Sequence, residues 1–168
     1  MSEKQVYRVY IKASPEKIWE AITKPEWTQR YGYSGLADFD LRPGGKHHTR
    51  VTPEIEAVGH SGDMVNGEVI EATPPRRLVI TWKLVMGPPE MAAEPYTTLT
   101  YDIEETKTVG TRLTVTHDLT GAPLTAAMVS GAGENIDAPQ NENAGGGWNW
   151  ILSDLKTLLE TGETISAA

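Results

Sequence analysis

The chain has 168 residues, and its 23 Asp and Glu against 15 Lys and Arg give a net charge of −8 at pH 7. This acidic balance argues against nucleic acids and anionic membranes as partners, and the lack of cysteine excludes disulfides, thiol catalysis and cysteine-based metal sites. The length suits a single domain over residues 1–168. We expect it in the cytoplasm, because the chain shows neither a signal-type N-terminus nor an apolar run of about 18 residues.

The first predicted elements are a strand and a helix. Side chains alternate with a period of two over residues 5–12, and β-branched and aromatic residues dominate one side, which is typical of a strand. Ser14 then suits the cap of a helix and Pro15 its first position, and the next residue is a glutamate, which favours the positive end of the helix dipole. We expect this helix to continue to Thr23.

A second short helix is predicted from Pro25 to Gly32. Proline suits the start of a helix, and glycine suits its end. Trp27 and Tyr31 stand one turn apart and share a face of this helix. Such a pair either walls a pocket or seals the helix against a sheet, and the sequence leaves both interpretations open.

The following hundred residues are predicted to be mostly β-structure. Six further strands are expected at residues 36–42, 46–52, 65–72, 78–85, 96–105 and 111–119. Short turns rich in Gly and Pro join most of them, which indicates an antiparallel meander. The segments 53–64, 86–95 and 120–145 are longer, and we expect loops there, with one helical turn near residues 124–129. Whether these loops act as a lid stays open.

The clearest helix lies near the end of the chain. Counting from Trp148, apolar residues recur at i+3, i+4, i+7, i+10 and i+11 and form a stripe along one side, which is the pattern of an amphipathic helix. The stripe consists of Trp148, Ile151, Leu152, Leu155, Leu158 and Leu159. We expect a helix of about 20 residues, or about 30 Å, that ends at Gly162.

Together these elements predict an α+β helix-grip fold. In it, a curved seven-stranded antiparallel sheet wraps around the long C-terminal helix, and two short helices follow the first strand. One helix leaves space against a strongly curved sheet, so we predict an internal apolar cavity with a few polar groups. The side chains expected to line it are Trp27, Tyr31, Trp82, Leu84, Leu99, Tyr101, His117, Trp148, Leu152 and Leu155.

Several motifs resemble one protein family. Residues 13–26, ASPEKIWEAITKPE, resemble the opening of the SRPBCC superfamily (START-like, birch-pollen-allergen-like), and in particular its branch related to the activator of the heat-shock-protein-90 ATPase. RPGGK at 42–46, GEVIEATPPRRL at 67–78 and GGW at 146–148 are similar to later motifs of that branch. The resemblance covers roughly residues 6–161. It implies the helix-grip fold and the binding of lipids, sterols, polyketides or other apolar molecules, with some members acting as enzymes.

We therefore predict a non-catalytic protein that binds a small hydrophobic or aromatic molecule and needs no cofactor. One alternative is an enzyme of cyclase, isomerase or hydrolase type, with His117 as acid or base and Tyr101 orienting the substrate. Another is a co-chaperone-like module with a chaperone as partner, which would use an exposed surface patch. Whether the chain forms a homodimer also stays open.

No metal site is expected. His47 and His48 are strand neighbours, so their side chains point to opposite faces and cannot bind one ion together. A site that adds His60 and Asp63 has no support from a recognised ligand spacing.

Overall fold

The computed structural model describes residues 3–59, 62–130 and 146–165. The strands are β1 (Lys4–Ile11), β2 (Leu36–Phe39), β3 (Lys46–Arg50), β4 (Asp63–Thr73), β5 (Arg77–Leu84), β6 (Thr97–Glu105) and β7 (Thr111–Asp118). The helices are α1 (Pro15–Thr23), α2 (Pro25–Thr28), α3 (Pro53–Ala57), α4 (Pro89–Ala92), α5 (Pro123–Ser130) and α6 (Gly147–Thr161).

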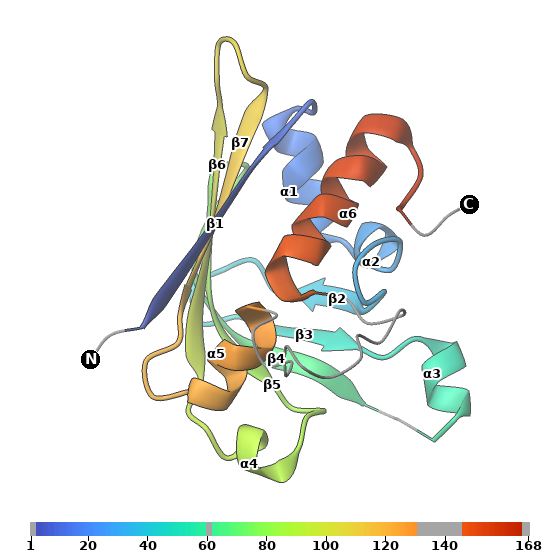
Figure 1. The fold of residues 1–168 in the computed structure, drawn as a ribbon, viewed down its shortest axis with the longest axis vertical. Helices are drawn as coiled ribbons and strands as arrows, with labels where there is room; N and C mark the ends of the chain where they lie inside the picture. Colours follow the sequence, from blue (N-terminus) through green and yellow to red (C-terminus); the bar gives the residue numbers. More distant parts are fainter. Residues whose placement is uncertain (1–2, 60–61, 131–145, 166–168) are drawn as a thin grey trace, which may run out of the picture.

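The strands form one curved antiparallel sheet in the order β1-β7-β6-β5-β4-β3-β2. One face of this sheet is covered by α6, with α1 and α2 beside it (Figure 1). Because β1 and β2 occupy opposite edges, α1 and α2 carry the chain across the covered face. The predicted helix-grip architecture is therefore confirmed.

The ends of the two main helices follow from local chemistry. The hydroxyl of Ser14 accepts a hydrogen bond from the N–H of Lys17 (3.2 Å) and caps α1, which begins at Pro15 and ends at Thr23 as predicted. Gly162 has a φ of 86°, a left-handed conformation that glycine adopts without strain, and it ends α6. The helix has 15 residues, fewer than the predicted length of about 20.

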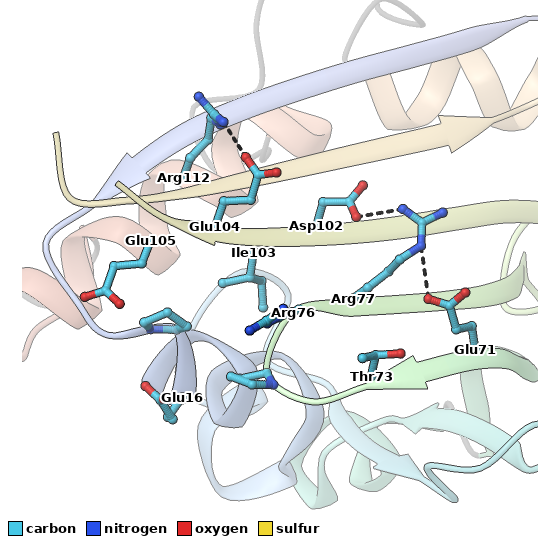
Figure 2. A pocket seen from close by; sticks show the side chains of 12 residues that line it. Glu16, Glu71, Thr73, Arg76, Arg77, Asp102, Ile103, Glu104, Glu105 and Arg112 are labelled. Carbon is cyan, nitrogen blue, oxygen red and sulfur yellow. Dashed lines mark hydrogen bonds and ion pairs between the residues drawn. The ribbon is translucent and has the colours of Figure 1, made fainter. Parts of the chain in front are cut away.

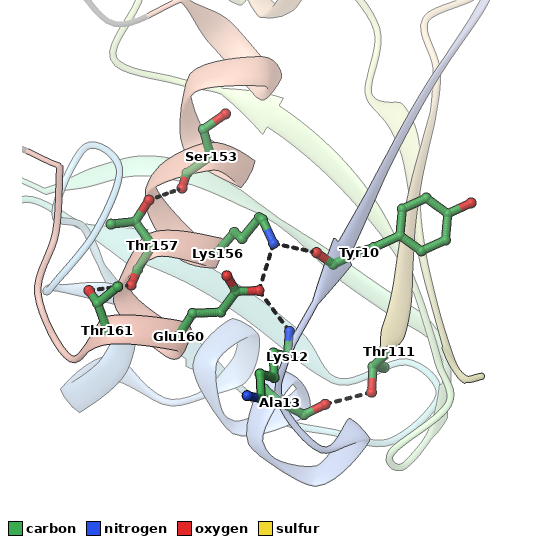
Figure 3. Close-up of polar contacts among 9 residues, drawn as sticks. All are labelled: Tyr10, Lys12, Ala13, Thr111, Ser153, Lys156, Thr157, Glu160 and Thr161. Carbon is green, nitrogen blue, oxygen red and sulfur yellow. Dashed lines mark hydrogen bonds and ion pairs between the residues drawn. The ribbon is translucent and has the colours of Figure 1, made fainter. Parts of the chain in front are cut away.

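Polar contacts attach the second half of α6 to the edge strand β1 (Figure 3). The Nζ of Lys156 donates to the backbone oxygen of Tyr10 (2.8 Å) and pairs with Glu160 (2.6 Å). The Glu160 carboxylate also accepts from the backbone N–H of Lys12 (2.8 Å). These contacts fix the helix along the β1 side of the sheet.

The expected loops contain more helix than predicted. Each of α3, α4 and α5 begins at a proline, namely Pro53, Pro89 or Pro123. Proline lacks an N–H that the first helical turn does not need, so it starts helices as well as ending them. The helical turn expected near residues 124–129 is part of α5, and residues 131–145 of the third segment lie outside the described part of the chain.

Two elements end well before the predicted residue, whereas the ends of the other strands differ by at most two residues. The helix from Pro25 ends at Thr28, and the chain then turns through Gly32 (φ 60°), whose N–H donates to Asp154 of α6 (2.9 Å). The strand that begins at Leu36 ends before the expected residue 42. Its turn residues bond to β4 instead, since the N–H of Gly44 donates to the carbonyl of Val69 (2.8 Å).

The interior has a packed half and an open half. Residues of β1, β6, β7 and α1 fill the packed half, where Leu99, Leu113 and Leu155 are at most 1% exposed. The open half lies beneath the first half of α6, toward β2 to β5. The outer face of β7 carries threonines that alternate with the buried residues, as predicted for a sheet covered on one side.

Candidate ligand-binding site

A cavity of about 390 Å³ occupies the open half of the interior. Its walls come from β2 to β6, from the segment after α2, from α5 and from the start of α6. The aromatic and imidazole rings that line it are Tyr31, Tyr33, Phe39, His47, Trp82, Tyr101 and Trp148. The described lining includes no Asp, Glu, Lys or Arg. A volume near the lower end of the usual range for small-molecule sites suits a compact guest.

The structure divides the residues that we predicted to line the cavity. Those that line it are Tyr31, Trp82, Leu84, Tyr101 and Trp148. Those that do not are Trp27, Leu99, His117, Leu152 and Leu155. The last four belong to the packed half, where each is at most 5% exposed. The cavity is therefore displaced toward β2 relative to the prediction.

Trp27 of α2 takes part in surface contacts. The Nζ of Lys17 lies 4.3 Å from the centre of its ring, and the guanidinium carbon of Arg30 lies 4.9 Å away. Such cations are attracted to the electron-rich ring face. The two side chains therefore have different places: Trp27 is half-buried and packs against the hydrophobic core under these cations, and Tyr31 lines the cavity.

His117 lies at the centre of a buried chain of hydrogen bonds. The indole N–H of Trp148 donates to its Nδ1 (3.1 Å), so this nitrogen carries no proton. Its Nε2 must then carry the proton and donate to the hydroxyl of Thr97 (2.8 Å), which donates in turn to the carbonyl of Trp82 (2.9 Å). His117 is fully buried, and burial lowers the pKa of its imidazole to about 4. It is a neutral structural group that positions two tryptophans of the cavity wall.

His47 was not predicted to line the cavity, but it does. Its ring stacks on Phe39 (centres 5.1 Å apart) and crosses β4 at Gly67, where no side chain obstructs it. The Nε2 reaches the carbonyl oxygen of Thr81 on β5 (2.6 Å), at a point where the pairing of β4 with β5 is interrupted. Burial lowers the pKa of His47, which keeps the ring neutral at pH 7.

His48 points to the opposite face of the sheet, where its Nδ1 lies 3.2 Å from Asp63. With His47 and Tyr96 it borders a groove of about 560 Å³ on that face. His60 lies outside the described residues. Within the described parts of the chain, no three His, Asp or Glu side chains gather in a way that would hold a metal ion.

A third, larger groove of about 760 Å³ lies by the β4–β5 turn (Figure 2). Ion pairs cover much of its rim: Arg77 contacts Asp102 (2.7 Å) and Glu71 (3.1 Å), and Arg112 pairs with Glu104. Pairs exposed to this degree contribute little free energy. The groove is therefore charged, unlike the apolar cavity.

Two acidic residues that the sequence analysis passed over support the cavity wall. The Glu94 carboxylate accepts from the N–H groups of Leu124 (2.7 Å) and Thr125 (2.9 Å) at the start of α5. Asp154, only 2% exposed, accepts from Gly32 (2.9 Å) and Ile165 (2.8 Å). A sequence signal existed for Asp154, because it is a charged residue beside the apolar stripe of a helix.

A family model described as Activator of Hsp90 ATPase homolog 1-like protein matches residues 12–160. The chain belongs to this family. The resemblance inferred from the sequence motifs is therefore confirmed. No match was found among curated proteins. In the described residues of this family member, no helix is long and apolar enough to cross a membrane.

Solved structures share the fold of this Hsp90-activator-like domain. Protein SSP2350 from Staphylococcus saprophyticus is 20% identical, with a TM-score of 0.62 over 99% of this chain and 98% of that one. CalU16 from Micromonospora echinospora is 22% identical, with a TM-score of 0.53 over 73% of this chain and 64% of that one. DynU16, from the dynemicin biosynthetic locus, is 20% identical, with a TM-score of 0.57 over 96% of this chain and 48% of that one. The chain thus spans less than two thirds of CalU16 and about half of DynU16.

Proposed function

We propose that the protein binds a small hydrophobic or aromatic molecule in the cavity beneath the first half of α6 and does not alter it chemically. The observation that supports this function is the ring-rich, apolar lining of a space that the sheet and the helix leave unfilled. Moving apolar surface from water into such a space contributes about 25 cal/mol per Å². Several rings around one guest therefore supply a driving force without any specific polar contact.

A binding role suits this lining better than catalysis. A general acid or base must lie within hydrogen-bond reach of the reacting atoms. His117 is not among the lining residues, and both of its ring nitrogens are engaged by Trp148 and Thr97. The described lining contains no carboxylate or lysine that could take the place of His117, and the Nε2 of the lining imidazole, that of His47, is bonded to the carbonyl oxygen of Thr81.

The test uses the neutral dye N-phenylnaphthylamine, whose fluorescence rises in apolar surroundings. Val65 is a half-buried strand residue that lines the cavity, and Val65→Trp should raise the dissociation constant at least about tenfold by filling the space. Val9→Trp is the matched control, because Val9 is also a half-buried strand valine but lies outside the cavity. Absence of dye binding by the folded wild-type protein, or equal effects of both variants, would refute the proposal.

A further inference from the structure

Several hydrogen-bond donors of the cavity wall have no partner among the described residues. Two of them belong to the half-buried rings of Tyr101 and Trp82, and the others are the hydroxyls of Tyr33, Ser34 and Thr49. Neither the hydroxyl of Tyr101 nor the indole N–H of Trp82 bonds to another described residue. By contrast, Tyr31 donates to the carbonyl of Ala21 (2.8 Å), and the indole of Trp148 donates to His117. In the described residues no fully buried side-chain nitrogen or oxygen lacks a partner, so the free donors of Tyr101 and Trp82 are accessible to a small molecule.

The lining also lacks compensation for a charged guest. None of the described lining residues is Asp, Glu, Lys or Arg. Burial lowers the pKa of His47, and its Nε2–H donates a hydrogen bond to the carbonyl oxygen of Thr81. A carboxylate that entered this space would lose its hydration and meet no cationic side chain, only the partial positive charge at the start of α6, so its burial is costly. The cavity therefore disfavours fatty acids and other anions.

From these two observations we infer that the guest is an uncharged aromatic molecule with a hydrogen-bond acceptor, such as a carbonyl group attached to the ring. This acceptor takes a hydrogen bond from the Tyr101 hydroxyl. This inference rests on the proposed function and narrows its ligand class. A pure hydrocarbon displaces water from Tyr101 and Trp82 and leaves both donors unpaired, whereas a carbonyl oxygen restores a bond. A site with free donors rejects molecules that cannot use them.

Three naphthalenes substituted at the same ring position test the inference: acetylnaphthalene, isopropenylnaphthalene and naphthoate. The first two have the same shape and differ in a carbonyl oxygen against a methylene group, and the third is an anion. Affinities are measured by displacement of N-phenylnaphthylamine from the full-length protein. We expect acetylnaphthalene to bind about tenfold more tightly than isopropenylnaphthalene, and naphthoate to bind most weakly.

The variants Tyr101→Phe and Tyr31→Phe locate the effect. Tyr101→Phe should make the two neutral compounds bind about equally, because it removes the free hydroxyl. Tyr31→Phe also removes a hydroxyl from the wall, but one that is already bonded to Ala21, so the tenfold preference should persist. Equal binding of the neutral pair by the wild-type protein, or tightest binding of naphthoate, would overturn the inference while leaving the proposed function intact. Failure of all three compounds and of the dye to bind the folded protein would refute both.

Discussion

Replacing Thr97 by valine removes one hydroxyl from the buried chain of hydrogen bonds and leaves the shape of the site almost unchanged. Thr97 is 3% exposed, and its hydroxyl accepts from His117 (2.8 Å) and donates to the carbonyl of Trp82 (2.9 Å). In the variant, the imidazole N–H of His117 has no acceptor within the surrounding core. It cannot turn to find another, because Trp148 holds its other nitrogen.

The expected loss of stability follows from these contacts. A buried donor without a partner costs about 1–3 kcal/mol, and the carbonyl of Trp82 loses one bond worth about 1 kcal/mol. The added methyl group of valine offsets part of this cost, so we expect the free energy of unfolding to fall by about 2 kcal/mol. In urea unfolding followed by tryptophan fluorescence, this corresponds to a midpoint lower by about 1 M with an unchanged slope.

Thr100→Val provides the control on the same strand. Thr100 lies three residues further along β6, on the opposite face of the sheet, and its hydroxyl bonds to no other described residue. Its replacement should change stability by less than about 0.5 kcal/mol. If Thr97→Val unfolds at the same urea concentration as Thr100→Val, the buried chain does not stabilise the fold as argued.

Three further predictions concern pH, a glycine and a helix cap. Burial lowers the pKa of His117 to about 4 from its ordinary value of 6.5, so the unfolded chain binds the proton first as the pH falls. Stability should therefore fall as the pH drops from about 6.5 to about 4, and His117→Gln should flatten that part of the curve in urea titrations at stepped pH. Gly67→Ala would place a Cβ 1.9 Å from the backbone oxygen of Thr81 and 2.6 Å from Nε2 of His47. The midpoint of thermal unfolding should therefore fall by the equivalent of about 3 kcal/mol, and an unchanged midpoint would show that the backbone of β4 does not lie this close to Thr81 and His47. Burial alone would raise the pKa of Glu94, but the hydrogen bonds at the start of α5 outweigh burial and lower this pKa. The carboxylate therefore stabilises the fold above its pKa in the unfolded chain, and this stabilisation is lost as the pH falls through its pKa in the folded protein. Glu94→Gln should accordingly cost about 1 kcal/mol at pH 7 and nothing near pH 2 in chemical unfolding, and equal losses at both values would refute the capping role.

The local pattern of the sequence was sufficient to predict most of the helices and strands. The start and end of α1 follow from Ser14, Pro15 and the apolar spacing after them, because capping and amphipathic periodicity act over a few residues. The same holds for the stripe of α6 and its end at Gly162. The short helices α3 and α4, which begin at Pro53 and Pro89, were missed, since proline both ends and starts helices and only the surrounding contacts decide between the two.

The position of the cavity depended on tertiary structure. His117 shows the limit most clearly: its place on an apolar face was visible, but its partners Thr97 and Trp148 lie 20 and 31 residues away along the chain. Whether an inward-facing side chain meets another side chain or empty space depends on the curvature of the sheet and on the line along which α6 crosses it. That line is set by contacts such as Lys156 with Tyr10, 146 residues apart, which no local pattern encodes. The sequence by itself therefore determined the seven strands, the main helices and their order, while the packing of α6 against β1 decided which half of the interior stays open.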